Sequence, residues 1–326
     1  MPEITMVEAI RAAITEEMAR DERVVVLGQD VGQLGGVFRA TDGLLATYGP
    51  NRVMDTPLSE AVIAGSALGL AISGLVPVAE IQFLPFAHQA FHQIGPQLGR
   101  YRFRSQGTFN AQVTIRTPFG GGVRAPEHHP DAIEAQFVQT PGIKVVMPSN
   151  PYDAKGLLLE AIRDPDPVLF CEPLRGYRLV KGDVPDGDYT VPFGQSRVTR
   201  EGEDVTIVAW SAAVQLAERA AEQLATEGIS ARVLDLRTLV PLDVEGLVHA
   251  VEDTGRCVIA HEAPLSAGFG AEVVATLQEE AFYSLEAPIA RVTAPDTPYP
   301  IPSIEDLYVP NTEQVVAAAR ATVKAA

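Results

Sequence analysis

The sequence predicts an α/β protein with two parallel-sheet domains, and three observations support this fold class. The chain has 326 residues, about twice the length of a typical domain. Apolar residues make up 46% of it and charged residues 21%, a globular composition that can fill two cores. Short apolar segments alternate with longer amphipathic segments, which is the pattern of parallel strands joined by right-handed helical crossovers.

The first half of the chain predicts strands and helices in alternation. Residues 6–21 place Val7, Ile10, Ile14 and Met18 on one stripe, which predicts an amphipathic helix. The strands are short apolar runs that end in turns, as buried parallel strands do. We expect strands at 24–28, 76–83, 113–118, 143–150 and 168–173, and further helices at 60–73 and 151–164.

A long uncharged segment between Glu60 and Glu80 has nearly the length of a membrane span. It is rich in Ala, Gly and Ser, is interrupted by Gly74 and Pro77, and lacks basic or aromatic flanks. We therefore expect a buried helix and a buried strand here, and no membrane partner. The N-terminal residues lack a basic patch followed by an apolar run, so no signal peptide is expected.

Residues 174–196 are polar and rich in turn-forming residues, which predicts a linker or an edge hairpin. We place the domain boundary here and divide the chain into residues 1–185 and 186–326. A second α/β series follows. Its predicted strands are 205–210, 231–236 and 256–262, and its predicted helices are 211–227, 247–255 and 270–283.

Charge and cysteine content exclude several classes of protein. The chain has 25 Lys and Arg against 42 Asp and Glu, a net charge of −17 that argues against nucleic acid or an anionic membrane as main partner. Cys171 and Cys257 are its only cysteines. They allow neither a disulfide framework nor a Cys/His zinc site, and they favour a reducing, cytoplasmic setting.

Common sequence motifs for nucleotides and nucleophiles are missing. The sequence has no G-x-x-x-x-G-K-[S/T] phosphate loop and no G-x-S-x-G nucleophile elbow. Residues 268–274, GFGAEVV, have only one of the glycine spacings of a dinucleotide loop. His88 and His92 have the i,i+4 spacing of helical metal ligands, but no acidic ligand is near, which favours packing or a subunit contact.

Two segments are candidates for acid–base chemistry. His128 and His129 follow the flexible run of glycines 120–122, so they either belong to a pocket that exchanges protons near neutral pH or lie on a solvated loop. Glu60 is either a first-turn acid favoured by the helix dipole or a buried carboxylate with raised proton affinity. The residues alone leave the first question open and favour the dipole interpretation for Glu60.

Several sequence blocks between residue 5 and about residue 311 match one protein family: TMVEAIRAAITEEM, VLGQDVGQLGGVFRATDGL, DTPLSEAVIAGSALGLA, PVAEIQF, TIRTPFGGG, PGIKVVMPSNPYDAKGLL, VLDLRTLVPLD, LEAPIARV and DTPYP. With these blocks the chain resembles the beta subunit of the thiamine-diphosphate-dependent decarboxylating component of pyruvate and branched-chain 2-oxo-acid dehydrogenases. The resemblance implies a transketolase-like pyrimidine-binding domain followed by a transketolase C-terminal domain. It also implies oxidative decarboxylation of a 2-oxo acid, slightly favouring pyruvate, with acyl transfer to a lipoyl domain.

The resemblance implies roles for five residues. Glu60 would hydrogen-bond the aminopyrimidine ring of thiamine diphosphate and favour the tautomer that removes the thiazolium proton. Leu58 would contact the cofactor. Gln82 and Phe86 would line the pyrimidine pocket, with Phe86 stacked on the ring. His129 would serve decarboxylation and reductive acylation near the lipoyl entrance.

The sequence departs from the family pattern directly after this histidine. Many relatives have His-Ser-Gln-Ser or His-Ser-Asp-Ser, whereas here His129 is followed by Pro130, Asp131 and Ala132. The contacts that those serine hydroxyls would make are therefore in question. Glu134 keeps its spacing.

The resemblance also implies metals and partners. A structural potassium ion would be bound, largely through backbone oxygens, at Ala111, Val113, Thr114, Ala161, Asp164 and Asp166. The Gly-Asp-Gly stretch with which thiamine enzymes bind Mg²⁺ and the diphosphate is missing, so an alpha subunit should supply that side of the site. We expect two alpha and two beta chains on a dihydrolipoyl acyltransferase core. The uncharged stretches 61–79 and 81–99 fit a buried subunit contact.

Two other hypotheses stay open at this point. A transketolase-like or deoxyxylulose-phosphate-synthase-like enzyme half would use sugar phosphates and need a basic phosphate pocket. A non-catalytic structural subunit would have lost its chemistry, and only the changed loop after His129 supports it. A substrate screen distinguishes the first, and cofactor binding by the reconstituted pair distinguishes the second.

Overall fold

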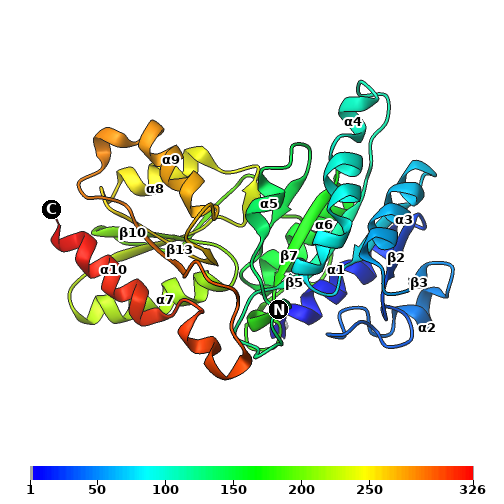
Figure 1. Cartoon of the computed structure of the whole chain (residues 1–326), viewed down its shortest axis with the longest axis horizontal. Coiled ribbons are helices and arrows are strands. Elements are labelled where there is room, and N and C mark those ends of the chain that lie inside the picture. Colours follow the sequence, from blue (N-terminus) through cyan, green and yellow to red (C-terminus); the bar gives the residue numbers. More distant parts are fainter. Residues whose placement is uncertain (1–2, 326) are drawn as a thin grey trace.

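The computed structural model describes residues 3–325 and has two lobes side by side (Figure 1). The N-terminal lobe contains a seven-stranded sheet in which every strand but β12 runs parallel to its neighbours. The central strands are buried along their whole length, as their continuous apolar sequences predict. The strand order is β12 (Thr238–Val240), β6 (Lys144–Val146), β7 (Val168–Pro173), β5 (Thr114–Phe119), β4 (Val76–Glu80), β2 (Val24–Gly28) and β3 (Val53–Asp55).

Helices cover both faces of this sheet. On one face, α1 (Met6–Arg20) and α6 (Pro151–Arg163) pack against each other and against the sheet. A capping box at Thr5 starts α1, and Asn150 caps α6. On the other face lie α3 (Glu60–Ile72), η1 (Leu84–Ala90) and η2 (Gln93–Gly99). The remaining short helices of this lobe are α2 (Leu44–Tyr48), α4 (Tyr101–Arg104) and α5 (Glu134–Val138).

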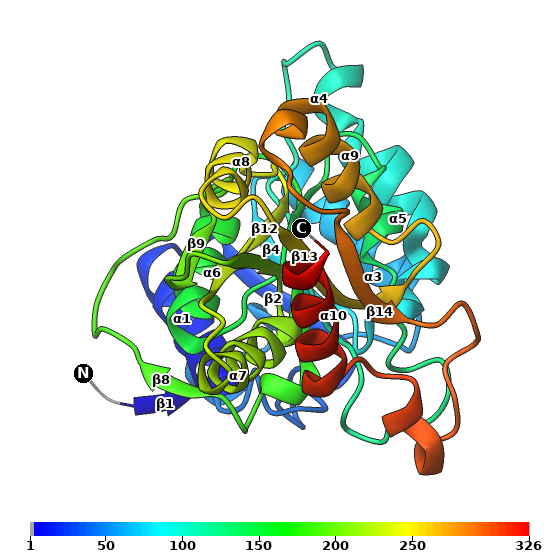
Figure 2. The same ribbon diagram turned by 90° about the vertical axis from the view of Figure 1, so that its left-hand side faces the viewer.

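The C-terminal lobe is a second α/β layer structure. Its five strands are β14 (Ala290–Ala294), β13 (Cys257–Pro264), β10 (Val205–Ala209), β11 (Ala231–Asp235) and the antiparallel edge strand β9 (Arg197–Arg200). Figures 1 and 2 show helices on both faces of this sheet. One face is covered by α7 (Ala212–Thr226) and α10 (Thr312–Lys324), and the other by α8 (Val244–Glu252) and α9 (Gly270–Glu280).

Most predicted elements are present, although several differ in their bounds; the predicted strand 76–83 ends at Glu80, for example, and the predicted helix 270–283 at Glu280. Of the linker and the edge hairpin predicted for 174–196, the hairpin is wrong, because β8 (Lys181–Asp183) pairs with the N-terminal β1 (Glu3–Thr5) instead. The predicted strand 143–150 ends at Val146. The predicted helix 247–255 begins earlier, since the Asp243 carboxylate caps it by accepting a hydrogen bond from the Gly246 amide at 3.0 Å.

The uncharged segment 61–79 forms the rest of α3 and most of β4, which confirms the predicted helix and strand. Within residues 3–325 no helix combines the length and apolarity that a membrane crossing requires. Pro96 lies inside η2, where its missing N–H explains why regular α-helical hydrogen bonding gives way to π-type turns. Cys171 and Cys257 are both buried and unbonded to each other.

Candidate active site

The predicted site residues follow the carboxyl ends of parallel strands in the N-terminal lobe. The strand register pairs Gly28 with Asp55 and with Glu80, and Glu80 with Arg116, so these strand ends lie at one edge of the sheet. The loops after β3, β4 and β5 leave the sheet along this edge. In open parallel sheets, ligands bind outside this carboxyl edge.

Glu60 is the first residue of α3 and is 8% exposed. Its carboxylate accepts no hydrogen bond and forms no ion pair with any residue that the structure describes. Its carboxylate oxygens are not among the enclosed atoms that lack a partner, so they remain accessible to solvent or to a donor from outside the described residues. Leu58, two residues earlier, is 72% exposed, which is unusual for a large apolar side chain beside a buried acid.

Three rings, Phe83, Phe86 and His129, form what we call the ring cluster. The centroid of His129 lies 4.7 Å from that of Phe83 and 5.0 Å from that of Phe86, and both contacts are edge-on. The Nδ1 atom of His129 lies 3.2 Å from the Glu127 carbonyl oxygen. With the proton on Nδ1, this hydrogen bond leaves Nε2 free to accept or give a proton.

His128 adds a second imidazole on the outside of the ring cluster. Its ring lies 5.5 Å from that of Phe86, and its Nδ1 atom lies 3.6 Å from the Asp131 carboxylate. The structure therefore brings Phe86 and His129 into direct contact. Glu60 and Leu58 have no hydrogen bond, ion pair or ring contact with them in the described part of the chain.

Gln82 connects the loop after β4 to the loop after β2, which was not predicted. Its Nε2 atom lies 3.3 Å from an Asp30 carboxylate oxygen and 3.5 Å from the Gln29 carbonyl oxygen. The loop after β2 is fixed in turn by Asp55, whose carboxylate accepts hydrogen bonds from the Gly32 amide at 2.6 Å and from the next amide at 3.1 Å. Gln82 thus holds the loop after β4 next to the loop after β2.

A buried charge network underlies this edge of the sheet. Arg116 is enclosed and donates to both Glu172 oxygens, at 2.7 and 2.6 Å, and to Glu80. Burial raises the pKa of Glu80 against the opposing effect of Arg116. Burial alone would lower the pKa of the Arg116 guanidinium, but Glu172 and Glu80 raise it well above its usual range. In the sequence, the members of this network are visible only as single charged residues within apolar segments, so their pairing could not be predicted.

A second group of buried polar side chains lies where the two lobes meet. Glu134 and Glu262 each have one carboxylate oxygen without a hydrogen-bond partner among the described residues. Burial raises the pKa of Glu134 to about 7, against hydrogen bonds from its own amide and the Trp210 indole. Burial also raises the pKa of Glu262 to about 7, with Arg175 opposing and Glu134 adding to the effect.

The predicted potassium ligands lie at the opposite, amino edge of the sheet. The Asp164 carboxylate is paired with Lys144, and the Asp166 carboxylate lies 2.5 Å from the Arg102 Nε atom. The Thr114 hydroxyl is buried without a hydrogen-bond partner among the described residues. One oxygen of the predicted set is thus free for a cation, while both carboxylates already face a cationic side chain.

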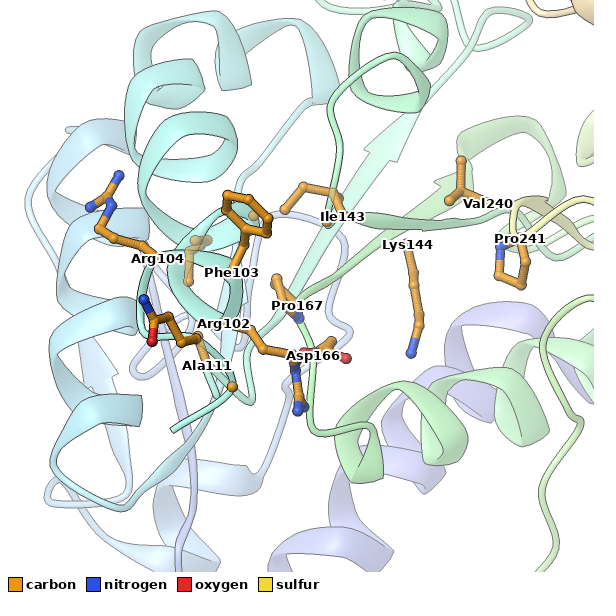
Figure 3. A pocket seen from close by; sticks show the side chains of 15 residues that line it. Arg102, Phe103, Arg104, Ala111, Ile143, Lys144, Asp166, Pro167, Val240 and Pro241 are labelled. Atoms are coloured by element: carbon orange, nitrogen blue, oxygen red, sulfur yellow. Dashed lines mark hydrogen bonds and ion pairs between the residues drawn. The ribbon is translucent and has the colours of Figure 1, made fainter. Parts of the chain in front are cut away.

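A cavity of about 890 Å³ lies beside these residues and not at Glu60 (Figure 3). Apolar side chains that line it include Phe103, Ile143, Val240 and Pro241, and Asp166 is one of its charged lining residues. The described residues contain no group of three or more His, Cys, Asp or Glu side chains arranged to bind a metal ion. His88 and His92 are exposed, and the Nε2 atom of His88 lies 2.8 Å from the Gln136 side-chain oxygen.

Two domain families match the chain. The transketolase pyrimidine-binding domain matches residues 2–180, and the transketolase C-terminal domain matches residues 194–315. A solved split-gene transketolase, described as an inactive beta4 tetramer, superposes with a TM-score of 0.81 over 99% of both chains at 27% identity. Together with the two parallel sheets, these matches define a transketolase-like protein and confirm the predicted fold class.

Relatives of higher sequence identity show to which family of transketolase-like proteins the chain belongs. The pyruvate dehydrogenase E1 component subunit beta of Staphylococcus epidermidis is 50% identical over 324 residues, which are 99% of this chain and 100% of that protein. The same subunit of Staphylococcus aureus is 49% identical with the same coverage. The chain belongs to this family, the beta subunits of the pyruvate dehydrogenase E1 component. The sugar-phosphate enzyme half finds no support among these relatives.

Proposed function

We propose that this chain is the beta subunit of a cytoplasmic, thiamine-diphosphate-dependent pyruvate dehydrogenase component that acts only together with an alpha subunit. The observation on which this rests is the Glu60 carboxylate, buried and unpartnered at the carboxyl edge of a transketolase-like sheet. Its relatives at 50% identity are pyruvate dehydrogenase E1 beta subunits, which favours pyruvate over branched-chain 2-oxo acids.

The residues of this chain fit the pyrimidine end of the cofactor. When bound, thiamine diphosphate supplies the nucleophile and the electron sink for decarboxylation. Glu60 offers a charged acceptor to the ring nitrogen of the aminopyrimidine, and the surrounding burial strengthens this hydrogen bond. Phe86 offers an aromatic face, Leu58 an exposed apolar contact and Gln82 a free amide oxygen. We assign proton transfer to the substrate or the acyl acceptor to His129, and the contact of its Nδ1 atom with the Glu127 carbonyl oxygen supports this role.

A partner chain would complete the site. The exposed side of α3 presents Val62, Ser66 and Gly69, which are small or apolar on a helix without interior charge. Leu34 and Leu58 are exposed on the neighbouring loops. Exposed apolar surface of this kind marks a protein contact. We propose that an alpha subunit covers it and binds Mg²⁺ and the diphosphate, in an assembly of two alpha and two beta chains on a lipoyl-bearing acyltransferase core.

Two finer proposals concern the rest of the chain. The domains divide at residues 185 and 186, between the two matched families. A potassium ion binds at the amino edge of the first sheet, supported by the free Thr114 hydroxyl. Replacing sodium by potassium should then raise the melting temperature of the full chain, and Thr114→Val should abolish the difference. Equal melting temperatures in both salts would remove this ion from the proposal.

Reconstitution tests the main proposal. The chain is produced alone and together with its alpha partner, and both samples receive thiamine diphosphate and magnesium. We expect release of carbon dioxide from pyruvate by the pair only, with 3-methyl-2-oxobutanoate turned over more slowly. Equal turnover by the isolated chain contradicts the shared site, and faster turnover of the branched substrate contradicts the choice of pyruvate.

A further inference from the structure

The loop that leads from β5 to His129 is contacted at its start by groups from outside the N-terminal sheet. It begins with three successive glycines, and two of them have positive φ angles, +88° at Gly120 and +87° at Gly122. At each glycine an added Cβ atom would collide with a neighbouring side chain: Gly120 with Glu262 at 2.3 Å, Gly121 with Tyr299 at 2.3 Å and Gly122 with Arg175 at 2.8 Å. Glu262 and Tyr299 belong to the C-terminal lobe, so this lobe is packed directly on the backbone of the loop.

A buried carboxylate of the C-terminal lobe accepts hydrogen bonds from the backbone of the same loop. Glu305 is 1% exposed, and its two oxygens accept hydrogen bonds from the Arg124 amide at 3.2 and 3.1 Å. The Tyr299 hydroxyl donates to the same carboxylate at 2.6 Å. Glu305 lies in η5 (Pro302–Leu307), the orange-red turn at the lower junction of the lobes in Figure 1. Arg124 has a φ of 53°, an uncommon conformation for a residue other than glycine.

The buried hydrogen bonds to Glu305 contribute more than the ion pair that the Arg124 side chain forms at the surface. A charged acceptor that is buried against a backbone N–H makes a strong hydrogen bond, and its loss leaves the N–H without a partner. The Arg124 side chain forms a separate ion pair with Asp306 at 2.7 Å, but both side chains are largely exposed. An exposed ion pair of this kind contributes little. Glu305 and Tyr299 therefore determine the loop backbone, whereas Asp306 does not.

We propose that Glu305 and Tyr299 are positioning residues for His129. The C-terminal lobe, which supplies no residue to the ring cluster, holds the His129 loop through the Arg124 amide. The chain from Arg124 to His129 is short and is fixed at its far end by the Phe83 and Phe86 rings. This inference rests on the proposed function for the step that His129 serves, but the contact itself can be tested without it.

The kinetic test uses the full chain assembled with its alpha partner. Glu305→Ala should lower kcat for acyl transfer to a lipoyl domain by about tenfold or more, because small displacements of a catalytic group are costly, and should change the KM for pyruvate less than twofold. Glu305→Gln, which keeps one acceptor for the Arg124 amide, should recover most of the rate. In a His129→Ala background, Glu305→Ala should cause no further loss. If Glu305→Ala lowers kcat further in the His129→Ala background, so that the two effects multiply, the proposal is overturned.

Hydrogen exchange gives the second readout on the same assembled protein. Peptides that cover residues 120–129 should exchange faster in Tyr299→Phe and in Glu305→Ala than in the wild type. The control Asp306→Asn, which removes only the exposed ion pair, should leave their exchange unchanged. Unchanged exchange in Tyr299→Phe, which deletes a single oxygen and keeps the ring, refutes the contact even if Glu305→Ala fails to assemble. An assembly that is inactive on every 2-oxo acid refutes the proposed function, while the exchange data still decide the contact.

Discussion

Three buried glutamates of the described residues lack hydrogen-bond partners, but only two of them have carboxylate oxygens that are fully enclosed. Glu60 has no partner among the described residues, and Glu134 and Glu262 each have one oxygen without a partner. Their positions distinguish them. Glu60 lies at the open edge of the sheet, where a ligand can reach it, whereas the other two are enclosed between the lobes. The same chemical group therefore lies at an accessible edge in one place, where we propose that it binds the cofactor, and at the contact between the lobes in the other.

Glu60→Gln separates charge from shape. The amide is nearly isosteric but cannot hold a negative charge, so we expect turnover of the assembled enzyme to fall by at least about 100-fold. The melting temperature should stay within about 2 °C, because Glu60 has no ion pair or hydrogen bond within the chain to lose. The matched control is Glu8→Gln, another first-turn glutamate, which lies in the capping box of α1. Turnover of Glu60→Gln equal to that of Glu8→Gln would remove Glu60 from the mechanism.

Glu262→Gln should change how stability depends on pH. The pKa of Glu262 rises from its ordinary 4.5 to about 7 in the folded chain, so the folded state keeps a proton that the unfolded state loses between these values. The contribution of this group to stability therefore falls as pH rises through that window. The neutral amide escapes the loss, so the variant should gain roughly 1–3 kcal/mol on the wild type between pH 5 and pH 8. Urea unfolding at both pH values measures it, and an equal difference at both contradicts the argument.

The α3 helix shows how far sequence reasoning reaches for a single element. Its start at Glu60 and its burial were predicted from an uncharged segment that ends at glycine and proline. The hydrophobic pattern could not show which side stays exposed, because α3 is apolar on all sides and only packing against β4 and η1 selects the buried side. The exposed side, with Val62, Ser66 and Gly69, became visible only in three dimensions.

A charge on that exposed side should prevent assembly and leave the chain folded. Ser66→Arg places a long cation in the middle of the side that we assign to the alpha subunit, and a buried unpaired charge in an interface is expensive. We expect the variant to keep the wild-type circular dichroism spectrum and melting temperature, since Ser66 is exposed, and to elute apart from the alpha subunit in size-exclusion chromatography. Thr226→Arg, on the outside of α7, is the control. Normal association of Ser66→Arg would place the alpha contact elsewhere.

Elements with short or isolated patterns escaped prediction. The three-residue strands β3 and β12 are too short for a periodic pattern, and β9 is an exposed edge strand. The helix α10 is different, because Asn311 and the apolar stripe after it were visible signals. Among site residues, Glu305 was missed because it bonds Arg124 across a sequence separation of 181 residues, and Tyr299 was missed because it acts through Glu305. One local sequence feature could have indicated a contact in this region: Glu262 is a charged residue within the mostly apolar strand β13.

The two lobes share more than a surface contact. Strand β12 leaves the C-terminal lobe and pairs with β6 at the edge of the N-terminal sheet. Beside it, Arg237 donates to the fully buried Asp153 carboxylate at 2.7 Å, and Ser149 donates to Asp235. Burial and the neighbouring Asp153 raise the pKa of Asp235 to about 7. The Glu305 contact with Arg124 adds a second connection at a distant point of the same junction.

These connections predict that the chain unfolds as one unit. Calorimetry of the wild type should show a single transition with equal calorimetric and van't Hoff enthalpies, although two matched domain families divide the sequence. Arg237→Leu leaves the Asp153 carboxylate buried without its closest cation, so it should lower the free energy of unfolding by about 3–5 kcal/mol. Arg320→Leu removes the exposed ion pair with Glu227 and should lower the free energy of unfolding far less. Two resolved transitions in the wild type would mean that each lobe folds on its own. In that case the pairing of β12 with β6 would not couple the stability of one lobe to that of the other.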